Sequence, residues 1–257
     1  MKIKVFKYII PILLVSGLCH AAATYTGNTD DYGAWHTVQP DVTNGLVFWA
    51  PMNQGTGSAV RDVSGYGANG TSTGATWYQV AGKRGMSFDG IDDYVTMPYS
   101  TGTNIEGSSS VSLSVWVWPI TQDGGTNYIL YKRRFVSSSD RGGFFLQNSA
   151  ATPDFSLSNN NNVTTVTSPS TIGTQTWSHV CGVYNIATGG SVLLYVNGTQ
   201  VASGTLTSGI GTHSTTAITI SSSSTASDIN AVLDDIRIYN RALSSSEVLQ
   251  LYTNGAK

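Results

Sequence analysis

The chain has 257 residues, of which 11% are charged and 40% are hydrophobic, and its formal net charge is −2. Soluble domains average about a quarter charged residues, so the polar surface must consist mainly of neutral groups. The hydrophobic share allows a sizeable core and argues against intrinsic disorder, and the lack of a basic excess argues against a nucleic-acid partner.

Residues 1–23 have the pattern of a secretory signal peptide. Lys2, Lys4 and Lys7 form a basic start, the run 8–18 is mostly apolar, and small residues follow. The apolar run is too short for a spanning helix, so we expect no membrane span. The pattern predicts export, with a secreted, cell-surface or periplasmic location after the leader is removed.

Cysteine usage fits an exported protein that is held together by its core. Cys19 lies in the predicted leader, where lipidation is an alternative although Leu18 does not suit a lipobox. Cys181 is then alone in the mature chain, so no disulfide can form within it. It lies in a strand-like apolar run, which predicts a buried free thiol.

Residues 24–44 are polar without a sustained period, and we predict a tail or a peripheral strand there. From Leu46 onwards, short apolar runs alternate with Gly, Asn and Ser clusters, which is typical of an antiparallel sandwich. The run 111–118 alternates strictly, which places its valines on one face and Trp116 and Trp118 on the other.

The end of the chain shows turn and helix signals. The dipeptide at 197–198 is Asn-Gly between two apolar runs, which predicts a tight hairpin. A short helix is predicted over 245–251, where Ser244 and Glu247 form a capping box. We therefore expect one all-β domain, a two-sheet antiparallel sandwich with a short C-terminal helix.

Seven motifs follow one another in the chain: GLVFWAPM at 45–52, DVSGYGANG at 62–70, FDGIDDYV at 88–95, VSLSVWVWP at 111–119, WSHV at 177–180, LYVNG at 194–198 and LDDIRIYNRAL at 233–243. Their residues and order resemble the laminin-G-like, concanavalin A-like jelly rolls of the bacterial LamG type. The resemblance spans about 45–257. It implies a jelly roll with one concave sheet, and ligand sites on that face or in the rim loops.

The resemblance does not extend to the glycosidases of this superfamily. Those enzymes carry an E-x-D-x-E strand, whereas the only glutamates here are Glu106 and Glu247, and neither lies in such a strand. His179 is predicted to have a structural hydrogen-bonding role. We therefore expect no enzymatic activity.

Calcium is the cofactor that the resemblance implies, because related folds often tie an early loop to the acidic last strand through this ion. Carried over, the ligands are Asp62 and Asp234, with carbonyls around Gly65 and Gly67. Asp234 shares the parity of Ile236, so it should point inward and need a partner. The alternative is turn chemistry: Asp62 caps its own loop, and Asp234 accepts backbone N–H groups. Both interpretations stay open.

For two other polar runs, we expect structural roles. Asp89, Asp92 and Asp93 are interpreted as turn formers around Gly90. The basic run 132–134 is interpreted as a solvated strand end, with an anion contact as the alternative.

Sugar binding would require exposed rings beside neutral polar groups. The candidate rings are Trp118, Tyr66, Trp77 and Tyr78, with ordinary packing as the alternative for each. Trp118 is the one expected to be exposed.

The sequence thus predicts a secreted, non-catalytic, lectin-like module for a neutral glycan or cell-surface polysaccharide. The alternative is an extracellular adhesion or structural protein that binds another protein, and a polysaccharide-degrading glycosidase is the least favoured. A polar concave face with one or two solvent-exposed rings would favour a sugar, and a broad apolar patch would favour a protein partner.

Overall fold

The computed structural model describes residues 41–257 apart from residues 101, 104, 106–109, 123–124, 138–139, 150, 160–161, 212–215, 223–227 and 256–257, and it does not describe the side chains of 133–142. The predicted leader 1–23 with Cys19, the tail up to residue 40, and Glu106 therefore lie outside the described residues. The described residues all fall within one compact unit.

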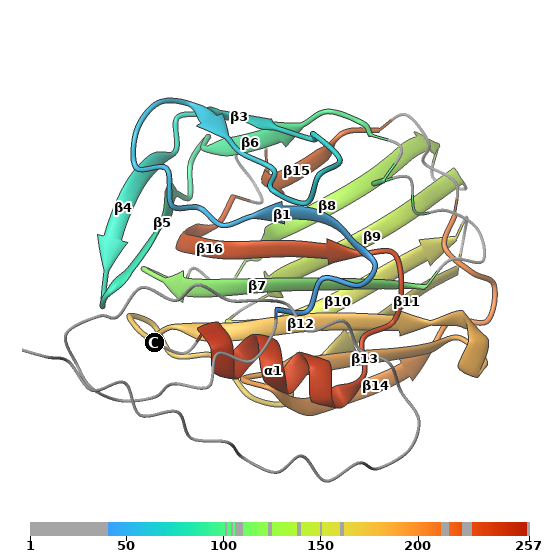
Figure 1. The fold of residues 1–257 in the computed structure, drawn as a ribbon. Coiled ribbons are helices and arrows are strands. Elements are labelled where there is room, and N and C mark those ends of the chain that lie inside the picture. Colours follow the sequence, from blue (N-terminus) through green and yellow to red (C-terminus); the bar gives the residue numbers. More distant parts are fainter. Residues whose placement is uncertain are drawn as a thin grey trace, which may run out of the picture. The chain divides into compact units, whose positions relative to one another are not determined.

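Within the described residues, the strands form two antiparallel sheets (Figure 1). Sheet A contains β1 (Leu46–Ala50), β4 (Thr76–Val80), β5 (Lys83–Asp89), β7 (Val111–Pro119), β12 (Ser178–Asn185), β13 (Ser191–Val196), β14 (Thr199–Thr205) and β16 (Asn230–Tyr239). Sheet B contains β2 (Ala59–Val60), β3 (Gly70–Thr73), β6 (Tyr94–Met97), β8 (Thr126–Ser137), β9 (Asp140–Ser149), β10 (Thr152–Asn159), β11 (Asn162–Thr167) and β15 (Ile218–Ser221). The helical segments in the described part of the chain are η1 (Ile186–Thr188) and α1 (Ser245–Gly255).

The strand order interleaves the two ends of the chain. Sheet A runs β14–β13–β12–β7–β16–β5–β4, with β1 also paired to β16, and sheet B runs β11–β10–β9–β8–β15–β6–β3–β2. The predicted all-β, two-sheet antiparallel sandwich with a short C-terminal helix is confirmed.

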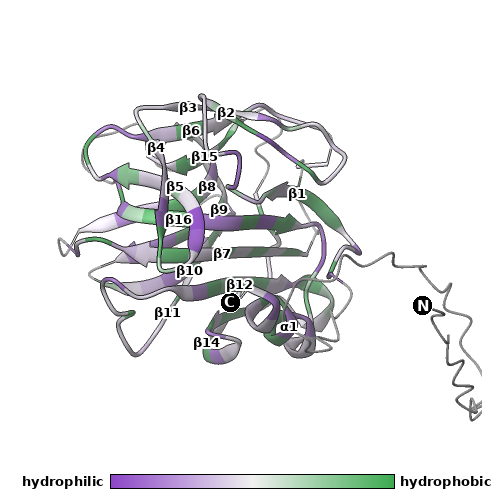
Figure 2. Cartoon of the chain, turned by 60° about the vertical axis from the view of Figure 1, so that its left-hand side comes forward, coloured by the Kyte–Doolittle hydropathy of each residue, from purple (hydrophilic) through white to green (hydrophobic). Residues whose placement is uncertain are grey.

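The main core lies between the sheets. Hydrophobic and hydrophilic residues alternate along strands of both sheets (Figure 2). In β7, Val111, Val115 and Val117 join this core, whereas Trp116 faces the opposite side of sheet A. The predicted alternation of this strand is confirmed. Successive side chains of a strand point to opposite faces, so a strict apolar/polar alternation fixes which face packs against the main core.

A second apolar cluster covers the outer face of sheet A, where α1 packs across β12 and β13 (Figure 1). Cys181, Val183 and Tyr195 of the sheet belong to this cluster, as do Val248 and Leu251 of the helix. Cys181 is a buried free thiol, as predicted, and burial raises its pKa.

The chain around Val42 packs against the same face. The Tyr239 hydroxyl donates to the Val42 carbonyl at 3.0 Å, and Asp41 pairs with Arg237 at 2.6 Å. Within the described part of the predicted tail, residues 41–44 form no strand but are anchored by these contacts.

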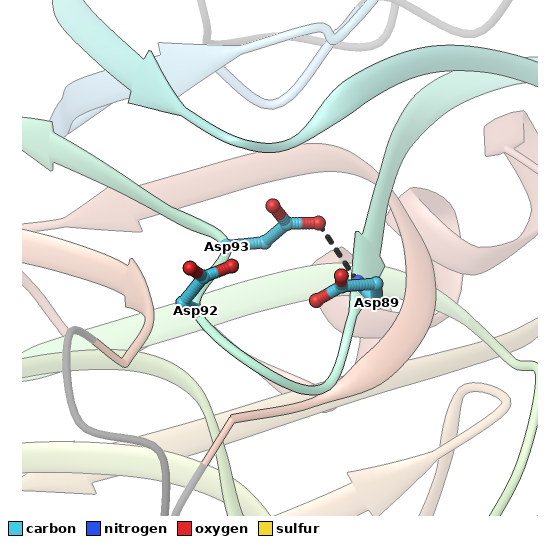
Figure 3. Close-up of side chains that lie close together, drawn as sticks. All are labelled: Asp89, Asp92 and Asp93. Carbon is cyan, nitrogen blue, oxygen red and sulfur yellow. Dashed lines mark hydrogen bonds between the residues drawn. The ribbon is translucent and has the colours of Figure 1, made fainter.

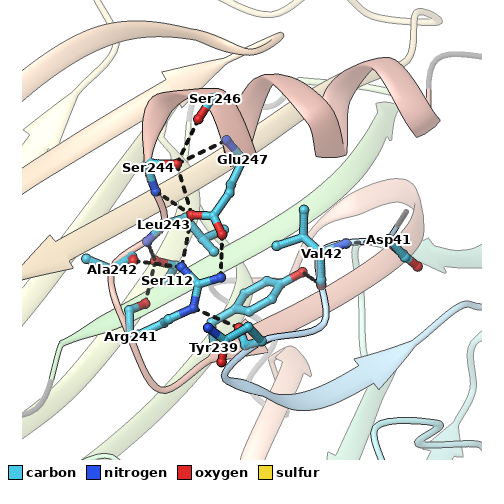
Figure 4. Close-up of polar contacts among 11 residues, drawn as sticks. Asp41, Val42, Ser112, Tyr239, Arg241, Ala242, Leu243, Ser244, Ser246 and Glu247 are labelled. Carbon is cyan, nitrogen blue, oxygen red and sulfur yellow. Dashed lines mark hydrogen bonds and ion pairs between the residues drawn. The ribbon is translucent and has the colours of Figure 1, made fainter. Parts of the chain in front are cut away.

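The helix cap is the one that the sequence predicts (Figure 4). The Ser244 backbone amide donates to Glu247 Oε2 at 2.9 Å, and the Glu247 amide donates to Ser244 Oγ at 3.3 Å. Arg241 donates to both carboxylate oxygens of Glu247, and this is the largest cause of a Glu247 pKa of about 2. The helix continues to Gly255, four residues beyond the predicted end.

Candidate functional site

A groove of about 210 Å³ lies on the outer face of sheet B, which faces away from the core. We call it the sheet-B groove. Its lining comes from the four adjacent strands β8, β9, β10 and β11. The residues that line it are Tyr128, Phe145, Gln147, Ser156, Ser158, Val163 and Thr165.

The strand register explains why these side chains share one face. Gln147 lies opposite Tyr128, and Ser156 lies opposite both Phe145 and Thr165. Directly opposed residues of antiparallel strands point to the same face, and residues two apart on one strand do so too. The four consecutive strands β8 to β11 therefore build one surface.

The floor of the groove is polar and buried. Ser156 and Ser158 are 4% and 2% exposed although they face away from the core, because larger side chains flank them. Ser156 Oγ lies 2.7 Å from Thr165 Oγ1, whereas Ser158 Oγ has no hydrogen-bonding partner. A buried polar atom without a partner is costly, so this floor is suited to a polar ligand.

Asp154 extends the same face of β10, opposite Gln147. It is 3% exposed, and its Oδ1 atom has no hydrogen-bonding partner. Burial raises its pKa, while hydrogen bonds from Ser149, Gln147 and Ser156 lower it.

Aromatic rings form one side of the groove. The Tyr128 ring lies 5.0 Å from the Tyr131 ring and 5.9 Å from the Phe145 ring, measured between centroids, in tilted arrangements. Tyr128 and Tyr131 are half-buried. Rings that keep one edge in solvent offer the apolar surface on which a sugar ring stacks.

The four predicted rings lie elsewhere, and none of them lines a described hollow. Tyr66 in the loop before β3 and Tyr78 on β4 are 48% and 52% exposed. Trp77 packs against the main core and donates from Nε1 to the Gly57 carbonyl at 2.7 Å. For Trp77, the structure therefore shows packing.

Trp118 is half-buried, so the expectation of an exposed ring is wrong. Its ring packs against Trp177, with centroids 5.7 Å apart. Trp116, on the same strand face, is buried against Tyr252 of α1. Contacts from α1 and from the loop at Trp177 thus cover the face of β7 on which an exposed ring was predicted.

Asp62 is held by backbone amides of its own loop and of β1. Its Oδ1 accepts from Trp49 N at 3.1 Å and from Ser64 N at 2.9 Å, and its Oδ2 accepts from Ala68 N at 2.9 Å. Gly65 and Gly67 have φ values of 97° and 71°, so glycine suits both turn positions. This is the predicted turn chemistry.

Asp234 does not point into the core, and the parity argument for it is wrong. Ala231 and Leu233 face the core, and so do Ile236 and Ile238, because a β-bulge inserts one residue between the two pairs. Asp235 adopts φ 47° at this bulge. Asp234 therefore shares the outer face of sheet A with Val232.

A second hollow, of about 470 Å³, contains Asp234 and charged neighbours from sheet A, next to the last turn of α1. Asp234 lies 3.8 Å from Lys83 Nζ, and Asp235 accepts from Arg237 Nε at 2.8 Å. Burial raises the pKa of Asp234 to about 7 despite the Lys83 charge. Oppositely charged side chains thus pair within this hollow.

Neither carboxylate fits the implied calcium site well. Three backbone amides already donate to Asp62, and Asp234 is paired with the Lys83 ammonium at 3.8 Å, whereas calcium prefers a cluster of oxygen ligands. Calcium binding by Asp62, Gly65, Gly67 and Asp234 stays a prediction.

His179 and Lys132 are both buried and hydrogen-bonded within the fold. His179 is fully buried, and its Nε2 lies 2.8 Å from Ser114 Oγ. Burial is the largest cause that lowers its pKa to about 3. Lys132 is buried as well and donates to the Thr103 carbonyl at 2.8 Å, so it is not the predicted solvated strand end.

None of the site residues predicted from the sequence lies in the sheet-B groove. The run 152–159 alternates, with Phe155 and Leu157 in the core and Ser156 and Ser158 on the opposite face. That alternation could have marked β10 as a strand with a polar outer face. It could not have shown which neighbouring strands complete the groove, because strand order is a tertiary property.

Comparison with solved structures shows the same fold. Domain 4 of AbnA, an extracellular arabinanase from Geobacillus stearothermophilus solved with arabinotriose, is 18% identical with a TM-score of 0.59, and the alignment covers 80% of this chain and 98% of that domain. The binding domain of botulinum neurotoxin DC solved with SialylT is 15% identical with a TM-score of 0.60. The same domain solved with rat synaptotagmin II is 16% identical with a TM-score of 0.63. Each neurotoxin alignment covers 82% of this chain and 52% of that chain.

The chain thus spans about half the length of the toxin binding domains that it matches. Among curated proteins, none matches the sequence significantly. In the part of the chain that the structure describes, no helix has both the length and the apolar character needed to span a membrane. The family model of the concanavalin A-like lectin/glucanase superfamily matches residues 89–249, and the chain belongs to this family.

Proposed function

We propose that the protein is a non-catalytic carbohydrate-binding domain that holds a neutral glycan in the sheet-B groove. The observation that carries this proposal is the buried serine floor, with Ser158 Oγ unpartnered, beside the Tyr128 and Phe145 rings. A sugar offers C–H faces for stacking and hydroxyls for hydrogen bonds, so it matches both features. The described lining residues carry no charge, which suits a neutral glycan.

The family and its structural neighbours support this proposal. The AbnA domain was solved with a trisaccharide, and the neurotoxin domain with SialylT. Such folds host many functions, so the proposal of glycan binding rests on the geometry of the groove and not on the fold alone. The leader-like pattern of residues 1–23 adds export to the proposal.

The residues that line the groove support the proposal of binding without cleavage. Glycoside hydrolysis uses two carboxyl groups that flank the scissile bond. The described residues that line the groove include no carboxyl group. Asp154 extends the same face of β10, but one carboxyl group does not make the pair that hydrolysis uses. The Glu247 carboxylate accepts hydrogen bonds from the Ser244 amide in the helix cap and from Arg241.

A glycan array followed by calorimetry with the best ligand tests this function. Tyr128→Ala should weaken binding about tenfold, because it removes a stacking surface. Gln147→Ala should weaken binding as well, because it removes a polar contact from the same face. Matched controls are Tyr78→Ala and Gln79→Ala, which change the same residue types outside the groove and should leave binding unchanged.

The same experiment distinguishes sugar binding in the groove from sugar binding at the rim loops and from binding of a protein partner. Binding that is lost in Tyr66→Ala or Trp118→Ala but kept in Tyr128→Ala would place the sugar at the rim loops and refute the groove. Absence of any glycan binding, together with binding to an extracellular protein, would favour the adhesion role.

A further inference from the structure

Charged side chains also gather away from the sheet-B groove. The carboxylates of Asp89, Asp92 and Asp93 lie close together at the β5–β6 turn (Figure 3). Asp89 Oδ1 accepts from Ile91 N, and Asp93 Oδ2 accepts from Asp89 N, both at 2.9 Å. These hydrogen bonds are the turn chemistry that the sequence predicts, and we assign no ligand to this turn.

The hollow of about 470 Å³ on the outer face of sheet A is larger than the sheet-B groove. We call it the sheet-A hollow. Side chains of β1, β5 and β16 form its wall, the β4–β5 hairpin forms one end, and the last residues of α1 lie beside it. Small-molecule sites usually have volumes of about 300–1,000 Å³, so the sheet-A hollow has room for such a ligand.

The wall of the hollow is held by a buried polar network. Trp49 Nε1 donates to Asp235 Oδ1 at 2.6 Å, and Arg237 Nε donates to the same oxygen at 2.8 Å. The Arg237 guanidinium carbon lies 4.2 Å from the centroid of the Trp49 ring, and Arg237 is 6% exposed. These contacts fix the wall, so little of it has to be ordered when a ligand binds.

Both carboxylates of the hollow have a counter-charge within the protein. Asp235 is paired with Arg237, and Asp234 lies 3.8 Å from Lys83 Nζ. Lys83 also donates to the Gly255 carbonyl at the end of α1. The two acids are therefore neutralised where they stand and do not call for a cationic ligand.

Arg84 is the cation of the hollow that no described contact pairs. It is exposed, and the ion pairs between described residues involve Lys83, Arg237 and Arg241 instead. A Cβ atom on Gly55 would lie 3.8 Å from Arg84 Nη1, so the guanidinium lies beside the loop that follows β1. Its forked N–H donors match the two oxygens of a carboxylate.

Neutral groups of the hollow add hydrogen bonds and an apolar surface. Asn53, in the loop after β1, and Asn254, near the end of α1, both line it. A side-chain amide both donates and accepts, as hydroxyl groups require of a partner. The half-buried Trp49 ring provides apolar surface on the wall.

We propose that the sheet-A hollow binds an acidic sugar, with the sugar carboxylate paired to Arg84 and the hydroxyls hydrogen-bonded to Asn53 and Asn254. A uronic acid carries a carboxylate, hydroxyls and an apolar ring face on one unit, so it matches all three kinds of lining group. An inorganic anion would match Arg84 alone. The site lies on sheet A, whereas the groove proposed for a neutral glycan lies on sheet B, so neither proposal depends on the other.

The test is calorimetric titration of the full chain, at low salt, with oligouronates prepared from pectin, alginate and hyaluronan. At least one should bind, and its carboxyl-reduced, neutral form should bind about tenfold more weakly or worse, because it lacks the charged partner of Arg84. Arg84→Gln should weaken uronate binding to a similar extent. Arg84→Lys keeps the charge but loses the fork, so it should restore only part of the affinity.

Arg61→Gln is the matched control, because Arg61 is also exposed but lies outside the hollow. It should leave uronate binding unchanged. Since Arg84 is exposed, Arg84→Gln should keep the wild-type melting temperature, which separates loss of a ligand contact from misfolding.

The proposal fails if none of the three oligouronates binds, if Arg84→Gln binds them as tightly as the wild type, or if Arg61→Gln weakens binding equally. Uronate binding that Tyr128→Ala abolishes and Arg84→Gln leaves intact would place the acidic sugar in the sheet-B groove instead. Sodium sulfate that binds as tightly as the oligouronates would show a general anion site and overturn the choice of a sugar.

Discussion

At the residue scale, the contact between Arg241 and Glu247 links the end of β16 to the start of α1 (Figure 4). Glu247→Gln should lower the free energy of unfolding by about 0.5–2 kcal/mol near neutral pH, because it weakens the cap and removes the ion pair. The hydrogen bonds from Arg241 are the largest cause that lowers the Glu247 pKa from 4.5 to about 2.

A depressed carboxyl pKa stabilises the fold above the pKa of the unfolded chain, and this contribution is lost as the pH falls from about 4.5 through 2. Urea unfolding across this range should show the stability difference between wild type and Glu247→Gln shrinking as the pH falls. A constant difference across the range would contradict the ion pair as its source.

Asp234 should have the opposite pH dependence. Burial raises its pKa from 3.8 to about 7, so the folded state holds a proton that the unfolded chain releases. Wild-type stability should therefore fall as the pH rises from about 4 to 7, and Asp234→Asn should be the more stable protein above that range, by about 1 kcal/mol or more. Melting curves at several pH values would check this. A destabilised Asp234→Asn protein at high pH would show that the Lys83 ion pair outweighs burial.

At the element scale, the two sheets approach each other closely where β12 faces β10. A Cβ atom on Gly182 would lie 2.4 Å from the Phe155 ring. Gly182→Ala should therefore destabilise the protein by about 1–3 kcal/mol, because the core has no room for a methyl group there. Gly173→Ala is the control, since its new methyl group would meet atoms no closer than 3.6 Å. Equal stability of the two variants in urea would contradict this close packing.

At the scale of the whole molecule, the C-terminal strands complete both sheets. β16 lies between β7 and β5, and β15 lies between β8 and β6. Removal of residues 216–257 should therefore leave no folded sandwich, because each sheet loses an internal strand. We expect the truncated chain to lack a cooperative unfolding transition.

Labelling of Cys181 provides a second measurement of the same prediction. In a Cys19→Ser background, this buried thiol should be protected in the full chain and react in the truncated one at the rate of an unfolded peptide. A protected thiol after truncation would show that the remaining strands fold without β15, β16 and α1.

The sequence by itself determined the features that depend on neighbouring residues. Strict alternation determined which face of β7 joins the main core. Asn197 and Gly198, with φ 50° and 76°, formed the predicted hairpin turn, and Ser244 with Glu247 capped α1. These follow from local backbone preferences and from the two-residue period of a strand, so they can be predicted without the fold.

Only the tertiary structure decided the positions that depend on distant segments. The bulge at Asp235 reversed the face of Asp234, Trp177 covered Trp118, and four strands from β8 to β11 assembled the groove. Register and strand order bring these groups together, and they are set by burying both sheets in one core.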